Sequence, residues 1–341
     1  MHTSYWHPPS SQTQSEIQEL ENIFLFQYEK IASQQQSQLN TLKEILDEFE
    51  RAEVQALPLK GADLLLRSPV VRGLRSMCDI DLLIRKQDLA STVTILEKRG
   101  FIRYQYGKRF LAASFANESL DYLSKDRQII FDISWTTPYW DEREVLRLWD
   151  RALLYPTPMG ERKLLHPQDS LLYLTVHAVI FRGYLSPSFI QDLSWVLIEE
   201  EKIDWIGWCK EVRKLGLQAV VYHGLTYACR EGEMSLPQEV LERLRPRSLA
   251  ENGMAWLLRR MVVERCPENP TYLVPLLGAP RWKGKMRILQ RAFFPDASFI
   301  QFRCGEKSLA ERLLVGWVRP FRILFRSLKV LPKDFARLLG R

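Results

Sequence analysis

Cysteine is scarce in this 341-residue chain, which has only five cysteines, at positions 78, 209, 229, 266 and 304. No two of them form a Cys-x-x-Cys pair, so the sequence predicts neither a disulfide framework nor a zinc site. Free thiols are typical of proteins in a reducing compartment, and we therefore expect a cytoplasmic protein.

Long hydrophobic runs are also missing. No apolar stretch reaches the roughly 20 residues that a membrane-crossing helix needs, so we expect no transmembrane segment. The first residues, MHTSYWHPPSSQTQSE, have neither the basic start nor the apolar run of a signal peptide. With 46% hydrophobic and 26% charged residues, the composition is typical of a globular protein with a sizeable core.

Positive charge is concentrated near the end of the chain. Residues 281–341 contain 15 lysines and arginines against 4 acidic residues, a net charge of +11, whereas the chain as a whole has +7. Basic residues recur at helical steps within residues 308–331, at Arg312, Arg319, Arg322, Arg326 and Lys329. A solvated helix face is the ordinary interpretation. Contact with an anionic partner, such as RNA, a polyanionic glycan or a membrane surface, is the alternative.

Hydrophobic periodicity divides the chain into four regions. Residues 1–53 form an N-terminal helical segment, and residues 54–150 combine strands with helices. Residues 151–245 form a helical region on the expected substrate side, and residues 246–341 a basic helical region. The sequence therefore predicts an α+β protein with a mostly helical C-terminal part.

The N-terminal segment has two sets of apolar residues at three- and four-residue steps. They are Leu20, Ile23, Phe24, Tyr28 and Ile31, then Leu39, Leu42, Ile45, Leu46 and Phe49. We interpret both sets as a packing layer for the core rather than as a coil for a partner. The glutamine-rich patch between them, residues 34–38, is interpreted as a joint between two helices.

The most informative stretch is residues 54–84. A first strand, residues 54–59, ends at Lys60-Gly61, and a second strand begins at Asp79-Ile80-Asp81. Side chains alternate along a strand, so Asp79 and Asp81 point to one side while Ile80 points to the other. Adjacent carboxylates repel each other, and a divalent ion that also binds phosphates relieves this repulsion.

An isolated Asp-x-Asp is ordinarily a solvated turn, but two further features favour a metal–phosphate site here. A glycine that follows a strand and opens a helix lets backbone N–H groups and Lys60 hold phosphate. A third acid, Asp132, lies in another apolar run, residues 129–133. Three acids beside a glycine turn fit phosphoryl chemistry with two metal ions.

These residues resemble the nucleotidyltransferases of the DNA polymerase beta-like superfamily, and more narrowly a bacterial family of uncharacterised nucleotidyltransferases. The matching elements, in order, are Lys60-Gly61, Gly73-Leu74-Arg75, Asp79-Ile80-Asp81-Leu82-Leu83 and Asp132-Ile133-Ser134-Trp135. Further matches up to about residue 240 are Pro167 to Leu174, His177, Asp192-Leu193 and Asp204-Trp205. The chain departs from the pattern at Ala62, where the superfamily usually has serine, and at Ser134, where the family has histidine.

The resemblance implies a small mixed nucleotidyltransferase-type sheet with flanking helices. It also implies transfer of a nucleoside monophosphate from a nucleoside triphosphate to a hydroxyl-bearing acceptor, with release of pyrophosphate. Asp79, Asp81 and Asp132 would be the catalytic acids and would bind Mg²⁺ or Mn²⁺. Asp132 would also take the proton of the acceptor hydroxyl.

The phosphates would be bound by Lys60, Gly61 and Arg75. Arg75 has an equally good structural role, as the ion-pair partner of one of the site aspartates. His177 and Asp192 would either contact the acceptor or hydrogen-bond to each other in the helical core, and we favour the core.

The acceptor is left open between a small molecule, a peptide, another protein and tRNA. The competing hypothesis is a non-catalytic module that keeps the fold and binds RNA or a membrane surface through its basic C-terminal region. The three retained acids argue against it.

Overall fold

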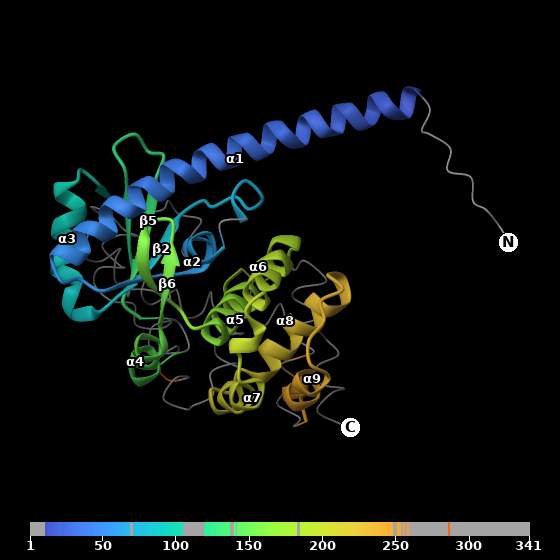
Figure 1. The fold of residues 1–341 in the computed structure, drawn as a ribbon. Helices are drawn as coiled ribbons and strands as arrows, with labels where there is room; N and C mark the ends of the chain where they lie inside the picture. Colours follow the sequence, from blue (N-terminus) through green and yellow to red (C-terminus); the bar gives the residue numbers. More distant parts are fainter. Residues whose placement is uncertain are drawn as a thin grey trace, which may run out of the picture.

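The computed structural model describes residues 11–68, 71–104, 119–136, 140, 142–182 and 185–247, with isolated positions at 251–253, 255, 258 and 286. The sequence also predicts a loose N-terminal stretch, residues 1–13, and strands at residues 109–115 and 119–123. Residues 1–10, the first of these strands and the basic segment at residues 308–331 lie outside this part, whereas residues 11–13 are helical, so the loose stretch is wrong there. In the described part, a sheet lies between a long N-terminal helix and a group of C-terminal helices (Figure 1). No helix in it is long and apolar enough to cross a membrane.

Helix α1, Ser11–Arg51, is one continuous helix of 41 residues. The joint predicted at residues 34–38 is therefore wrong. Glutamine is a good helix former, and the helix contains neither proline nor glycine to break it. At about 1.5 Å per residue, α1 is about 60 Å long.

Only the second half of α1 packs on the sheet. Leu39, Leu42 and Phe49 are buried in the cluster that covers one sheet face, which confirms the packing layer for this half. In the first half Leu20 is 66% exposed and Phe24 is 58% exposed, so the packing layer predicted there is wrong. Figure 1 shows this half of α1 extending beyond the rest of the described chain.

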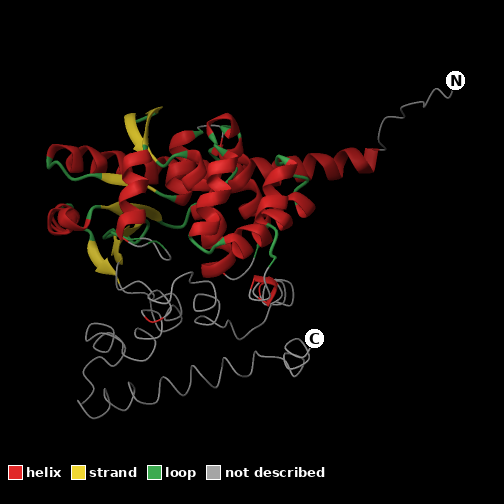
Figure 2. Cartoon of the chain, turned by 90° about the horizontal axis from the view of Figure 1, so that it is seen from below, coloured by secondary structure: helices red, strands yellow, loops and turns green. Residues whose placement is uncertain are grey.

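The sheet has five strands in the order β1-β2-β5-β4-β3. They are β1 Ala56–Pro58, β2 Ile80–Ile84, β5 Ile130–Ser134, β4 Ser119–Leu123 and β3 Ile102–Tyr104. Strands β2 and β5 run parallel, whereas every other pair is antiparallel. The mixed sheet and the α+β class are therefore confirmed. Figure 2 shows the strands gathered toward one end of the described part, with helices beside them.

The two faces of the sheet are covered differently. Ile80, Leu82 and Ile84 lie in the cluster with α1 and α3, Leu89–Lys98, as the alternation predicted. The chain enters α3 through a short 3-10 helix, Lys86–Asp88. Helix α2, Lys60–Arg67, follows β1 directly and joins the sheet to the C-terminal helices.

A β-hairpin interrupts the region that was expected to be helical from residue 151. Helix α4, Glu142–Arg151, is followed by β6, Leu153–Thr157, and β7, Gly160–Leu164. Gly160 has a φ of +92°, which favours glycine, and it allows the tight turn between the two strands. Tyr155 packs with the α1 side of the core, which anchors the hairpin.

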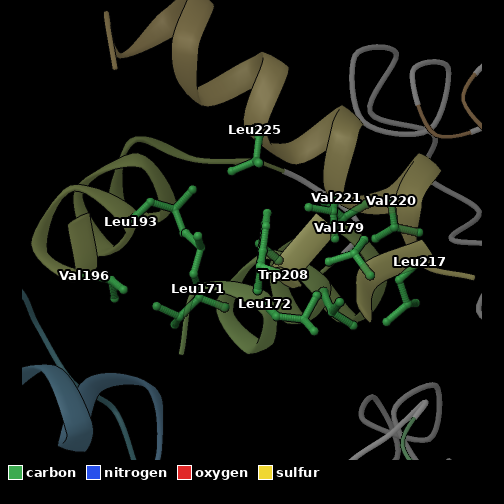
Figure 3. Packing of buried hydrophobic residues seen from close by; sticks show 14 of the residues in the cluster. Leu171, Leu172, Val179, Leu193, Val196, Trp208, Leu217, Val220, Val221 and Leu225 are labelled. Carbon is green, nitrogen blue, oxygen red and sulfur yellow. The ribbon is translucent and has the colours of Figure 1, made fainter. Parts of the chain in front are cut away.

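The remaining elements form a compact helical group around a second core. They are α5 Pro167–Val176, the π-helix η3 His177–Arg182, α6 Pro187–Leu197, η4 Glu200–Lys202, α7 Trp205–Lys214, α8 Gln218–Glu231 and α9 Gln238–Leu244. Figure 3 shows Trp208 of α7 among Leu171, Val179, Leu193 and Val221 from the neighbouring helices. This core extends to Leu83 and Leu57 of the sheet, so the helical group covers the face opposite α1.

Candidate functional site

Three carboxylates form a row across neighbouring strands. Asp81 on β2 is the Cα partner of Asp132 on β5, and Asp132 is the Cα partner of Asp121 on β4. Neighbouring strands lie about 4.8 Å apart, and residues in register share one face. Asp79 lies two residues before Asp81, just ahead of β2, and so continues the same face. The structure thus brings Asp79, Asp81 and Asp132 together and adds Asp121.

Asp121 was not among the residues singled out from the sequence. Its signal was an acid in the middle of the expected strand at residues 119–123. The strand pairing identifies Asp121 as a member of the acid row, because the register of β4 with β5 aligns it with Asp132.

Burial and repulsion from neighbouring carboxylates raise the pKa values of Asp81, Asp132 and Asp121. Asp81 is 4% exposed, and burial, together with the charges of Asp79 and Asp132, raises its pKa to about 7 against the opposing effect of Lys60. Burial raises the pKa of Asp132 to about 6, again against Lys60, and Asp121 adds to the rise. Asp121 itself has a pKa of about 6, because of burial and the charges of Asp79 and Asp81.

Lys60 supplies the opposite charge. It is the first residue of α2, and its ammonium Nζ pairs with Oδ1 of Asp81. Burial alone would lower the pKa of Lys60, but the nearby carboxylates, Asp81 foremost, outweigh it and raise the pKa, so the ammonium stays charged. The backbone of Lys60 has a φ of +49°, a strained conformation for a side chain of this size.

Gly61 allows Arg75 to lie against α2. A Cβ built on Gly61 would collide with Nη1 of Arg75 and would lie 3.1 Å from Sδ of Met77. The three phosphate-binding candidates Lys60, Gly61 and Arg75 therefore meet at one place beside the acids. Gly61 brings α2 close to the Arg75 guanidinium as well as opening the helix.

Arg75 pairs with a carboxylate outside the acid row. Its Nη2 donates to Oδ2 of Asp192 on α6 at 3.0 Å, and its Nε donates to Oδ1. Both side chains are about nine-tenths buried. The ion pair expected with one of the site aspartates thus forms with Asp192 instead. Asp192 joins the helical group to the loop that leads into β2.

Helices α2 and α5 run antiparallel beside the site. Ser170 donates to Asp63 at 2.7 Å, and Arg67 donates to the carbonyl of Leu165 at 2.6 Å. Tyr173 on α5 lies near Lys60 on α2, because the two groups interact electrostatically. Burial raises the pKa of Tyr173, and the site carboxylates add to the rise against Lys60.

Tyr173 belongs to an aromatic column at the wall of the site. Its ring stacks on Trp140 with centroids 6.0 Å apart and on His177 with centroids 6.3 Å apart. His177 begins the π-helix η3, a type of distortion that is frequent at functional sites. Tyr173 and Trp140 were missed from the sequence, because an aromatic residue that lines a site has the same sequence signal as one that packs in the core.

The acids fit a divalent cation chemically but are not closed around one. They offer oxygen ligands, and Oδ1 of Asp132 is buried without a hydrogen-bond partner. In the part of the chain that the structure describes, no three His, Cys, Asp or Glu side chains converge as a metal site. The Lys60 ammonium forms an ion pair with Oδ1 of Asp81. Metal binding at this carboxylate would therefore require the ammonium to shift, and a phosphate oxygen is its natural alternative partner.

The family model described as "uncharacterised nucleotidyltransferase" matches residues 8–230, well over half of the chain. The chain belongs to this family of uncharacterised nucleotidyltransferases, and the resemblance seen in the sequence is confirmed.

Among solved structures, the chain is similar to the lincosamide antibiotic adenylyltransferase LnuA with lincomycin bound. They share 14% identity over 46% of this chain and 93% of that one, with a TM-score of 0.34. It is also similar to ANT(2'')-Ia in complex with adenylyl-2''-tobramycin, at 12% identity over 48% and 89% of the chains, with a TM-score of 0.36. A solution structure of the antibiotic-resistance factor ANT(2'')-Ia has 13% identity over 55% and 98%, with a TM-score of 0.39. No curated protein matches the chain.

Proposed function

We propose that the protein is a metal-dependent nucleotidyltransferase that moves a nucleoside monophosphate from a nucleoside triphosphate to a hydroxyl-bearing acceptor. The observation that carries this proposal is the register of Asp81 with Asp132 on adjacent parallel strands. It aligns two carboxylates, with Asp79 beside them, on the face where the ammonium of Lys60 lies. If the acids had only a structural role, a glycine turn suited to binding phosphate would not be expected beside them.

Binding of the triphosphate falls to Lys60, Gly61 and Arg75. The Lys60 ammonium keeps its proton and can exchange Asp81 for a phosphate oxygen. Arg75 uses Nε and Nη2 on Asp192. Its Nη1 lies against Gly61 and donates to the carbonyl of Ser76 at 3.3 Å, and the second N–H of Nη1 is the one proposed for phosphate. The bidentate pair with Asp192 fixes the guanidinium plane before the substrate arrives.

The transfer step exchanges one P–O bond for another. The acceptor oxygen bonds to the α-phosphorus, and the bond from that phosphorus to the oxygen bridging the α- and β-phosphates breaks, which releases pyrophosphate. The hydroxyl proton passes to a carboxylate oxygen of Asp132, whose raised pKa suits a proton acceptor near neutral pH.

Asp79, Asp81 and Asp132 would hold the divalent ion, which would neutralise phosphate charge when bound. The aromatic column of Trp140, Tyr173 and His177 borders the same face and limits the room available to the acceptor. The candidate acceptors are a small molecule, a peptide, a protein and tRNA.

Labelled nucleoside triphosphates test the proposal. The protein is incubated with each triphosphate, Mg²⁺ or Mn²⁺ and cell extract, and both transferred label and pyrophosphate are measured. We expect turnover by the wild type and none by Asp81→Asn, with the thermal melt reporting whether the variant folds. Asp150→Asn, an exposed acid on α4, is the matched control and should retain full turnover.

A non-catalytic module that binds an anionic partner is the competing proposal, and it rests on the net charge of +11 in residues 281–341. The same incubation separates the two. A wild-type protein that binds no triphosphate in the presence of either metal would favour the module, and RNA or anionic liposomes would then be the ligands to test.

A further inference from the structure

Side chains of helix α1 hydrogen-bond to the backbone of the loop that contains Arg75. The backbone N–H of Gly73 donates to Oε1 of Gln35 at 2.7 Å, and Nε2 of Gln35 donates to the carbonyl of Arg75. One turn further along α1, Nε2 of Gln38 donates to the carbonyl of Met77 at 3.0 Å. Both glutamines are 1% exposed. Burying an amide is costly unless it is hydrogen-bonded, so the bonds made by Gln35 and by Nε2 of Gln38 commit these side chains to the loop, whereas Oε1 of Gln38 is buried without a hydrogen-bond partner.

The loop is also seated sterically. Gly73 has a φ of +77°, and a Cβ there would collide with the ring of Tyr28 on α1. On the other side of the loop, the Arg75 side chain pairs with Asp192, and the Met77 side chain lies against Gly61. The segment from Gly73 to Met77 is therefore held between α1 and the site. Arg75 is the side chain that extends from this segment to the site.

We infer that Gln35 and Gln38 are positioning residues of the nucleotide site, which they serve by fixing this loop so that Arg75 lies over Gly61. The inference rests on the proposed function, because it assigns Arg75 to the phosphates. It makes α1 part of the site, although α1 contributes no acid and no phosphate ligand. The glutamine-rich patch thus acts as a clamp.

The test replaces each glutamine by methionine, which has similar length and helix propensity but no amide. The matched control is Gln34→Met, because Gln34 is an exposed neighbour in the same patch. We expect Gln35→Met and Gln38→Met to weaken binding of a fluorescent ATP analogue with Mg²⁺ by about tenfold, which is a typical effect of losing one well-placed hydrogen bond. The KM for the triphosphate should rise more than kcat falls. Binding unchanged in both variants overturns the inference.

A double-mutant cycle with Arg75→Gln separates positioning from general loosening. If the clamp acts through Arg75, Gln35→Met causes no further loss of affinity once Arg75 has been replaced. Losses that simply add would overturn the inference, since they would mean that Gln35 supports the protein without acting on Arg75.

Hydrogen exchange at the Gly73 amide gives a readout that does not depend on activity. We expect a protected amide in the wild type and fast exchange in Gln35→Met, with exchange in Gln34→Met unchanged. Equal exchange in Gln35→Met and wild type overturns the clamp even if nucleotide binds. A wild type that binds no triphosphate overturns the proposed function, and the protected amide then reports a purely structural contact.

Discussion

Replacing Gly61 by alanine should separate stability from nucleotide binding. The added Cβ would collide with Nη1 of Arg75 and crowd Met77, so one of the two must move. Such overpacking costs about 1–3 kcal/mol, and alanine returns about 1 kcal/mol through its higher helix propensity. The net loss of folding free energy is therefore about 0–2 kcal/mol.

The effect on the nucleotide should be larger. Displacing Arg75 from Asp192 altogether would leave a buried carboxylate unpaired, which costs about 3–5 kcal/mol, so we expect the guanidinium to tilt while keeping that pair. Nη1 of Arg75 would then no longer lie at the position beside Gly61 where we propose that it binds a phosphate oxygen. A hydrogen bond to a charged group contributes about 1.5–3 kcal/mol, so affinity should fall about 10- to 150-fold.

Two assays on the same preparation test this reasoning. A thermal melt should show Tm lowered by no more than about 8 °C, and titration with a fluorescent ATP analogue and Mg²⁺ should show the loss of affinity. Gly253→Ala is the control, because a Cβ at Gly253 meets nothing within 4 Å. Wild-type affinity in Gly61→Ala would refute the assignment of this turn to phosphate binding.

Three further predictions concern other parts of the chain. Burial raises the pKa of Glu199, but hydrogen bonding from Tyr155 and the charge of Arg67 outweigh it and lower the pKa below 4.5. The stability contributed by Glu199 is thus fully present above about pH 4.5 and is lost as the pH falls through the lowered pKa, so the difference in urea unfolding between Glu199→Gln and wild type should be largest at pH 7 and shrink in acid. Asp121→Asn should lower turnover by at least about tenfold if Asp121 shares the charge of the acid row, and full turnover would remove it from the site. Deletion of residues 308–341 should weaken binding to RNA and anionic liposomes in low salt, and equal binding by the truncated chain would count against a role for this basic segment.

The local part of the candidate site follows from sequence patterns. Alternation along a strand is enough to place Asp79 and Asp81 opposite Ile80, and the apolar run around Asp132 marks a second strand. The likeness of these motifs to one family was specific because several short elements occur in order. All of this information lies within a few residues of each motif.

The rest depends on contacts between distant residues. Asp121 joins the acid row only through the pairing of β4 with β5, and Arg75 finds Asp192 117 positions away. The glutamine-rich patch suggested a joint because polarity alone does not distinguish a solvated glutamine from one buried on a backbone carbonyl. Periodicity likewise identified an apolar stripe on the first half of α1, but not that the stripe is exposed.

The most direct test of the central claim is Mn²⁺ binding measured by electron paramagnetic resonance, with a non-hydrolysable nucleoside triphosphate present. Asp132→Asn is the informative variant, because Asp132 forms no ion pair in the described part of the chain and its buried Oδ1 has no hydrogen-bond partner there. We expect the wild type and Asp150→Asn to bind Mn²⁺ with the nucleotide, and Asp132→Asn to bind it at least about tenfold more weakly. Equal Mn²⁺ binding by all three proteins would contradict the assignment of the acid row as the metal–nucleotide site.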